Sequence, residues 1–273
     1  MSKILFSDLD GTLLDDKKEI EQSNRDAICQ MLAAGHYFSI CTGRPLASAK
    51  LVAKQFHLDG EGCYIVAYNG GALYDPVKQE LISYASIPNQ AAWELIQKAE
   101  EAGLYVQTYD RANDTVLASS HLPELDFYTR GTKLPWKAGM DIIRQSMAED
   151  PPKIIVASLT SHENLERFQE ENAGWTSECM NSFFSCDQYL EYGPIGVSKG
   201  TGLKQLCDYL QVPVETSVAA GDERNDIAML QAAGIAAVPA NAHSSVCTYA
   251  DYICEKNNNE GAVAEIIGRF IYP

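Results

Sequence analysis

The 273-residue sequence is poor in basic side chains. Its 21 lysine and arginine residues stand against 37 aspartate and glutamate residues, which leaves a formal net charge of −16. This excess of negative charge argues against a broad nucleic-acid-binding surface, because the phosphates would be repelled. No run of 18 or more apolar residues is present, so we expect no membrane-spanning helix. Asp8 comes too early for the apolar stretch of a secretory signal, and a cytoplasmic protein is expected.

Patterns that bind transition metals are also missing. The eight cysteines include no Cys-x-x-Cys pair, and the five histidines include no His-x-x-x-His pair. We therefore expect no zinc site, and free thiols are the simpler interpretation of the cysteines. The composition is otherwise that of a globular protein, with 46% apolar and 21% charged residues.

The pattern of apolar residues predicts a split core. Up to residue 67, strand-like runs alternate with amphipathic helical stretches, which is typical of a parallel sheet wrapped by helices. From about residue 72 the pattern changes to α+β, and the alternation later resumes. We therefore predict an α/β fold with a Rossmann-like, doubly wound parallel sheet core formed by residues 1–82 and 188–273. Residues 83–187 form an inserted α+β domain in this prediction.

Polar, glycine-containing turns follow three of the predicted strands, at residues 7–12, 41–44 and 220–226. In open α/β sheets, ligands bind beyond the carboxyl ends of the strands. These turns are thus the candidate site.

Asp8 and Asp10 stand two residues apart in an extended segment, so both carboxylates can face the same side. Two close negative charges become tolerable if a divalent cation lies between them and a third carboxylate, for which Asp222 is the natural candidate. Mg²⁺ prefers such oxygen ligands. A carboxylate on Mg²⁺ beside phosphorus can act as a nucleophile. We therefore expect Asp8 to attack, and Asp10 to protonate the leaving alcohol and later activate water.

Other residues offer donors for a phosphoryl group. Thr42 supplies a hydroxyl and Gly43 allows close approach of the backbone, while Lys199 at a helix start can neutralise both the phosphate and Asp8. Asn225 can add an amide contact, and Asp226 can orient the neighbouring ligand as a supporting residue. Each residue alone also fits an ordinary helix cap, a helix N-terminal acid or a solvated side chain. Their combination at strand ends favours a phosphoryl-transfer site.

In this order the turns resemble the four motifs of the haloacid dehalogenase (HAD) superfamily, and of its Cof-type sugar-phosphate phosphatases with a class IIB cap. The matching segments are Asp8-Leu9-Asp10-Gly11-Thr12, Thr42-Gly43-Arg44, Lys199-Gly200, and Gly221-Asp222 with Asn225-Asp226. The resemblance implies a HAD-like core and a cap that sets substrate specificity. It also implies Mg²⁺ held by Asp8, the Asp10 carbonyl and Asp222. The phosphate contacts it implies are the Leu9 amide, Thr42, Gly43, Lys199 and Asn225, with Arg44 and Asn69 as candidate substrate or cap contacts.

The expected function is that of a Mg²⁺-dependent phosphatase. It would hydrolyse a small phosphorylated metabolite, such as a sugar phosphate, through a covalent aspartyl-phosphate, with no nucleic-acid or membrane partner. A phosphomutase or phosphotransferase with the same intermediate is one alternative, and a noncatalytic phospho-ligand sensor is another. A sensor should lack an essential group, yet the sequence contains every one of Asp8, Asp10, Lys199 and Asp222.

Three further features carry weaker expectations. The three tryptophans, at positions 93, 136 and 175, predict a separate small core in the inserted domain. Tyr109, Tyr128 and Trp136 are candidates for lining a substrate site, although packing is the simpler interpretation. The charged run at residues 15–19 and the asparagine run at residues 257–259 are expected to be exposed turns.

Overall fold

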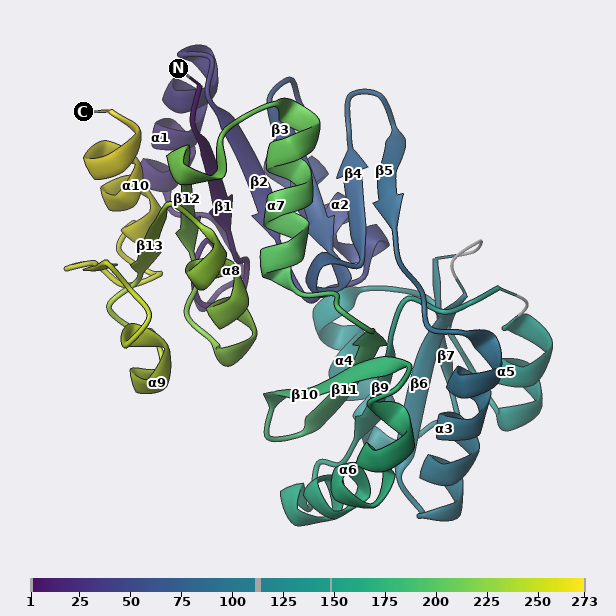
Figure 1. The fold of residues 1–273 in the computed structure, drawn as a ribbon. Helices are drawn as coiled ribbons and strands as arrows, with labels where there is room; N and C mark the ends of the chain where they lie inside the picture. The colour runs from purple at the N-terminus through teal and green to yellow at the C-terminus, as the bar shows by residue number, and fades with distance from the viewer. Residues whose placement is uncertain (1, 111–113, 148, 273) are drawn as a thin grey trace. The chain divides into compact units, whose positions relative to one another are not determined.

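The computed structural model describes residues 2–110, 114–147 and 149–272 and divides the chain into two compact units (Figure 1). The core unit comprises Met1–Ser83 and Ser198–Pro273, and the inserted unit comprises Tyr84–Val197. The chain thus returns to the core unit at Ser198 and not at the predicted residue 188. Among the described residues, no helix combines the length and apolarity needed to cross a membrane.

The core unit contains an eight-stranded sheet in the order β14-β13-β12-β1-β2-β3-β4-β5. Its parallel strands are β1 (Ile4–Ser7), β2 (Tyr37–Cys41), β3 (Cys63–Ala67), β12 (Ser217–Ala220), β13 (Ile235–Val238) and β14 (Tyr252–Ile253). Strand β4 (Ala72–Asp75) pairs antiparallel with β3, and β5 (Glu80–Tyr84) forms the edge. The predicted α/β fold class is confirmed.

Helices cover this sheet because its strands are apolar on both faces. Ile4 and Phe6 of β1 pack in a cluster with Leu203 and Met229 of the helices α7 (Lys199–Leu210) and α8 (Ile227–Ala232). Leu5, between them, is equally buried and points to the opposite face. The other helical elements are α1 (Gln22–Ala33), α2 (Leu46–Gln55), α9 (Ser244–Cys247), α10 (Ala262–Ile266), η1 (Tyr68–Gly70), η2 (Val214–Thr216), η3 (Arg224–Asp226) and η4 (Ile267–Ile271).

The inserted unit contains a six-stranded sheet in the order β10-β11-β9-β6-β7-β8. Its strands are β6 (Tyr105–Asp110), β7 (Thr115–Ala118), β8 (Trp136–Ala138), β9 (Ile154–Ala157), β10 (Met180–Cys186) and β11 (Tyr189–Pro194). Its helices are α3 (Asn89–Glu101), α4 (Pro123–Thr132), α5 (Met140–Ser146) and α6 (His162–Thr176). Strand β11 pairs antiparallel with both β9 and β10, which is why residues 188–197 belong to this unit and not to the core.

The aromatic residues of the inserted unit have mixed roles. Trp93 and Trp175 pack against its core, as the separate-core prediction requires. Trp136 instead is 40% exposed and contacts the ring of His121, so the prediction is wrong for this tryptophan. Tyr109 and Tyr128 are buried, with their hydroxyls 2.5 Å apart, which favours the packing interpretation.

Candidate active site

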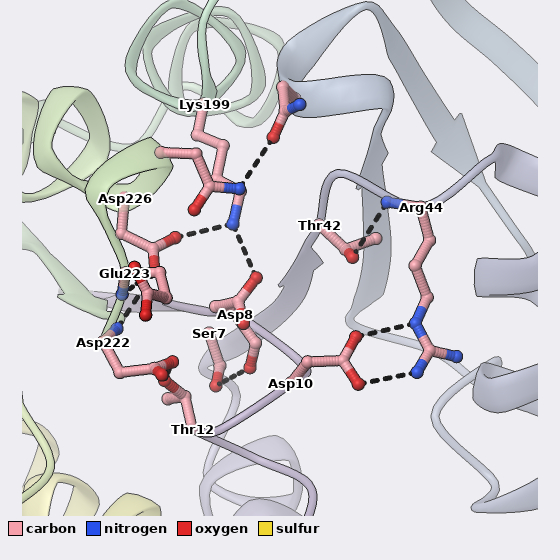
Figure 2. Close-up of polar contacts among 12 residues, drawn as sticks. Ser7, Asp8, Asp10, Thr12, Thr42, Arg44, Lys199, Asp222, Glu223 and Asp226 are labelled. Carbon is pink, nitrogen blue, oxygen red and sulfur yellow. Dashed lines mark hydrogen bonds and ion pairs between the residues drawn. The ribbon is translucent and has the colours of Figure 1, made fainter. Parts of the chain in front are cut away.

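The predicted site residues meet at one edge of the core sheet. Asp8 follows β1, Thr42 lies at the end of β2, and Asp222 follows β12 (Figure 2). Strand β1 lies between β2 and β12, and all three run parallel, so their carboxyl ends lie side by side. Strand order therefore brings together three residues that are far apart in the sequence.

Lys199 is the charged centre of the site. It is the first residue of α7, behind the capping box that Ser198 forms with Thr201, and its side chain is fully buried. Its Nζ lies 2.5 Å from Asp8 Oδ1 and 2.6 Å from Asp226 Oδ1 (Figure 2). Burial alone would lower the pKa of Lys199, but Asp226 and Asp8 outweigh it and raise that pKa above its usual value. The lysine therefore stays protonated inside the protein.

Asp226 is saturated with hydrogen bonds. Its Oδ1 accepts from Lys199, and its Oδ2 accepts from the backbone N–H groups of Asp222 and Glu223, both at 3.0 Å. At Gly221, a Cβ atom would lie 2.5 Å from Asp226, so this close approach requires glycine. Asp226 consequently fixes the backbone of the loop that carries Asp222.

Asp222 faces the loop after β1. Its Oδ1 accepts a hydrogen bond of 2.6 Å from Thr12 Oγ1. Gly11 has a φ of +86°, and a Cβ there would lie 2.3 Å from Asp222 Oδ2. Burial raises the pKa of Asp222 to about 7, with Asp226 adding to the effect against the Thr12 hydrogen bond. Burial thus disfavours the ionised form of Asp222, and a bound cation would offset this effect.

The donor set fits a hard divalent cation. Carboxylate oxygens of Asp8, Asp222 and Asp226 lie within 4.8 Å of one another. When all three carboxylates are ionised, they and the ammonium of Lys199 sum to a charge of −3 + 1 = −2. The pKa of Asp8 is well above its usual range, because of burial and then the neighbouring carboxylates, despite Lys199. Oδ2 of Asp8 and Oδ2 of Asp222 accept no hydrogen bond from the residues that the structure describes, so both can serve as ligands.

Asp10 lies in a different environment. Its carboxylate accepts two hydrogen bonds from Arg44, from Nε at 2.8 Å and Nη2 at 2.7 Å, and one from Lys18 Nζ at 2.8 Å. Figure 2 shows it pointing toward Arg44 and not toward Asp222. Burial would raise the pKa of Asp10, but Arg44 and Lys18 lower it to about 2. Asp10 is therefore ionised here, and Arg44, predicted as a substrate or cap contact, holds it.

The remaining predicted phosphate contacts surround the end of β2. Thr42 Oγ1 accepts from the Arg44 backbone N–H at 3.1 Å, and the Thr42 carbonyl accepts from Asn69 N–H at 3.0 Å. Asn69 Oδ1 in turn accepts from Asn225 Nδ2 at 3.1 Å. A Cβ at Gly43 would lie 2.9 Å from Asn69 Oδ1, which explains the glycine. Leu9, the remaining predicted contact, is buried between Asp8 and Asp10. Asn69 and Asn225 thus brace each other beside the loop of Thr42.

Sequence reasoning missed two site residues. Lys18 was expected in an exposed turn, and its side chain is 59% exposed, yet its ammonium bonds to Asp10. Asn258, in the asparagine run, is only 4% exposed. A motif search finds neither residue, because neither lies in one of the motifs; their side-chain partners identify them.

The chain is similar to known hydrolases and phosphatases. The chain matches the model of the haloacid dehalogenase-like hydrolase family over residues 5–267. It is 27% identical to the 5-amino-6-(5-phospho-D-ribitylamino)uracil phosphatase YcsE of Bacillus subtilis, over 97% of this chain and 94% of that protein. A haloacid dehalogenase-like hydrolase from Bacteroides thetaiotaomicron has a similar structure, with a TM-score of 0.89 and 27% identity, covering 98% of this chain and 99% of that one.

A sugar phosphatase of HAD subclass IIB shares the fold at 19% identity, with a TM-score of 0.80 over 98% of this chain and 99% of that one. Relatives named as phosphatases and the hydrolase fold identify the chain as a phosphoric monoester hydrolase. With a family model matched along nearly its whole length and the carboxylates and lysine gathered at one sheet edge, the chain belongs to the haloacid dehalogenase-like hydrolases.

Proposed function

We propose that this hydrolase is a Mg²⁺-dependent phosphatase that forms a covalent aspartyl-phosphate on Asp8. One observation carries the proposal. The Asp8 carboxylate is buried at the end of β1, one oxygen is held by Lys199 at 2.5 Å, and a carboxylate oxygen of Asp222 lies within 4.8 Å of one from Asp8. A nucleophilic carboxylate must be fixed in direction while keeping one oxygen available, and this arrangement does both.

The steps follow from the side chains present. Asp8 attacks phosphorus, the bond from phosphorus to the ester oxygen breaks, and the leaving alcohol takes a proton from Asp10. Asp10 then removes a proton from water, which attacks phosphorus, releases inorganic phosphate and regenerates Asp8. Lys199, the Thr42 hydroxyl and the backbone near Gly43 would bind the phosphoryl oxygens. Asp8, the Asp10 carbonyl and Asp222 would hold Mg²⁺, which would supply positive charge against the negative charge that builds up on these oxygens.

The pairing of Asp10 bears on this sequence of steps. An ionised Asp10 is the form that accepts a proton from water in the second step. Donation to the leaving alcohol in the first step requires the protonated form. The ion pairs with Arg44 and Lys18 therefore have to loosen when substrate is bound.

The proposed substrate is a small phosphorylated metabolite, such as a sugar phosphate. One relative carries a phosphorylated ribityl compound in its name, and one solved structure with the same fold is a sugar phosphatase. The residues above recognise phosphate and metal alone, so we propose that the inserted unit selects among substrates.

The test is Asp8→Asn, which preserves the shape of the side chain. We expect turnover of p-nitrophenyl phosphate to fall to background while the circular dichroism spectrum is unchanged. Asp208→Asn, on the exposed side of α7, should behave as wild type. With a hexose phosphate, the product should be inorganic phosphate and not an isomer. Retained turnover in Asp8→Asn would refute the proposed intermediate.

A further inference from the structure

Two asparagines from the C-terminal part of the core unit hold the loop after Asp10. Asn241 Nδ2 donates to the Gly11 carbonyl at 2.8 Å, and Asn241 Oδ1 accepts from the Asn258 backbone N–H at 2.9 Å. Asn258 Nδ2 donates to the Leu14 carbonyl at 3.1 Å and to Asp16 Oδ1 at 3.3 Å. We call Asn241 and Asn258 the asparagine brace.

The segment that carries Asn241 also reaches the other side of the site. Two residues after Asn241, the backbone N–H of His243 donates to the Asp222 carbonyl at 3.0 Å. One short stretch of chain is thus bonded to Gly11 in the first loop and to Asp222 in the last. A Cβ atom at Gly11 would lie 2.3 Å from Asp222 Oδ2, so the two loops already pack closely and have little room to shift.

The residues that the asparagine brace holds lie between Asp10 and Lys18 in the sequence. Gly11 directly follows Asp10, and Leu14 and Asp16 lead toward Lys18, whose Nζ lies 2.8 Å from Asp10. The brace therefore fixes both ends of a loop that turns back on Asp10. Side-chain amides suit this purpose, because their hydrogen bonds to carbonyl groups fix direction as well as distance.

We propose that Asn241 and Asn258 are positioning residues for phosphoester hydrolysis, and that they set the place of Asp10 relative to Asp222. They do not contact the reacting atoms in this scheme. The proposal rests on the proposed role of Asp10 as proton donor to the leaving alcohol.

Leaving-group dependence separates positioning from a merely structural role. The kinetic constant kcat/KM covers the steps up to departure of the leaving group, which include proton donation but not hydrolysis of the aspartyl-phosphate. Phenol is a poor leaving group that needs this proton, whereas p-nitrophenol leaves readily without it. A misplaced Asp10 should thus slow phenyl phosphate more than p-nitrophenyl phosphate. General loss of folded enzyme lowers both equally.

The variants are Asn241→Ala and Asn258→Asp, with Asn24→Ala as the matched control. Asn241 is exposed, so its loss should leave the fold intact even if Asn258→Asp does not fold. Asn24 is fully buried in the same unit, but it accepts from the Ala264 backbone N–H, away from the Asp10 loop. We expect the brace variants to lower the ratio of kcat/KM for phenyl phosphate to that for p-nitrophenyl phosphate by about tenfold. Asn24→Ala should leave this ratio unchanged.

An unchanged ratio in Asn241→Ala, or an equal change in Asn24→Ala, overturns the inference. Asp10→Asn, measured alongside, separates the two failures. If Asp10→Asn itself leaves the ratio unchanged, the proposed role of Asp10 is wrong. If it lowers the ratio and the brace variants do not, the role of Asp10 stands and the brace alone is refuted.

Discussion

Removal of the divalent cation should destabilise the core unit, and by more as the pH rises. The folded chain without a cation holds Asp222 with a pKa of about 7, against 3.8 for an ordinary aspartate. A carboxyl whose pKa is raised by folding keeps its proton more readily in the folded state. Stability from this group is therefore greatest below about pH 4 and falls until the pH passes about 7.

The magnitude follows from the size of the shift. A difference of about three pKa units corresponds to about 4 kcal/mol, because each unit is worth about 1.4 kcal/mol. A cation that binds the ionised cluster offsets this loss of folding free energy. The offset is complete only at a pH where Asp222 would otherwise be ionised and buried. The cation should thus stabilise the unit by about 4 kcal/mol at pH 8 and by less than half of that at pH 5.

The assay is thermal unfolding with excess Mg²⁺ or with EDTA, at pH 5 and at pH 8. We expect the melting temperature of the core unit to differ by about 10 °C at pH 8 and by only a few degrees at pH 5. Asp222→Asn keeps an acceptor for Thr12 but carries no charge. This variant should be more stable than wild type in EDTA at pH 8, and it should lose most of the gain from Mg²⁺.

Asp59→Asn, an exposed carboxylate of the same unit, should respond to Mg²⁺ as wild type does. Equal melting temperatures with Mg²⁺ and with EDTA at pH 8 would refute the reasoning. So would an Asp222→Asn protein that is less stable than wild type in EDTA, because the buried charge would then not be costly.

Two other ion pairs give further predictions. Arg44→Gln removes the ion pair with Asp10, whose pKa is about 2. Because this carboxylate is half-exposed, we expect the free energy of unfolding to fall by about 1 kcal/mol or less. Urea titrations should show the whole loss above about pH 4 and no loss toward pH 2. A loss independent of pH would contradict this. In the inserted unit, Lys153 Nζ lies 2.9 Å from Glu191 Oε2, and both side chains are buried. Lys153→Met should lower the free energy of unfolding by about 3–5 kcal/mol, because the Glu191 charge stays buried without the lysine. Adding Glu191→Leu should restore most of this stability. Denaturation of the single and double variants measures this, and a double variant less stable than Lys153→Met would contradict the explanation.

The sequence predicts the part of the site that depends on strand order. Asp8, Thr42 and Asp222 each lie at the end of a predicted strand, and parallel strands end at the same edge of a sheet. No contact had to be known to place them together. The sequence also predicts Lys199 at the start of a helix, where its ammonium can neutralise Asp8, and it is the first residue of α7.

Long-range hydrogen bonds account for what the sequence did not predict. The pairing of Asn258 with Leu14 joins positions 244 residues apart, and an asparagine run by itself indicates only a turn. The boundary at residue 188 was wrong for a similar reason. Residues 189–194 form strand β11, and their sequence does not indicate which sheet this strand joins. Its hydrogen bonds to β9 and β10 decide that question.

The charges of the site explain how an acidic protein can bind an anion. In its ionised form, the cluster of Asp8, Asp222, Asp226 and Lys199 carries −2, while Asp10 with Arg44 and Lys18 carries −1 + 2 = +1. The fully ionised site therefore carries −2 + 1 = −1, within a chain of net charge −16. A bound divalent cation changes this to +1. The excess of carboxylates that repels a phosphate ester is therefore what attracts the cation, and charge alone favours the order in which the cation binds first and the ester second.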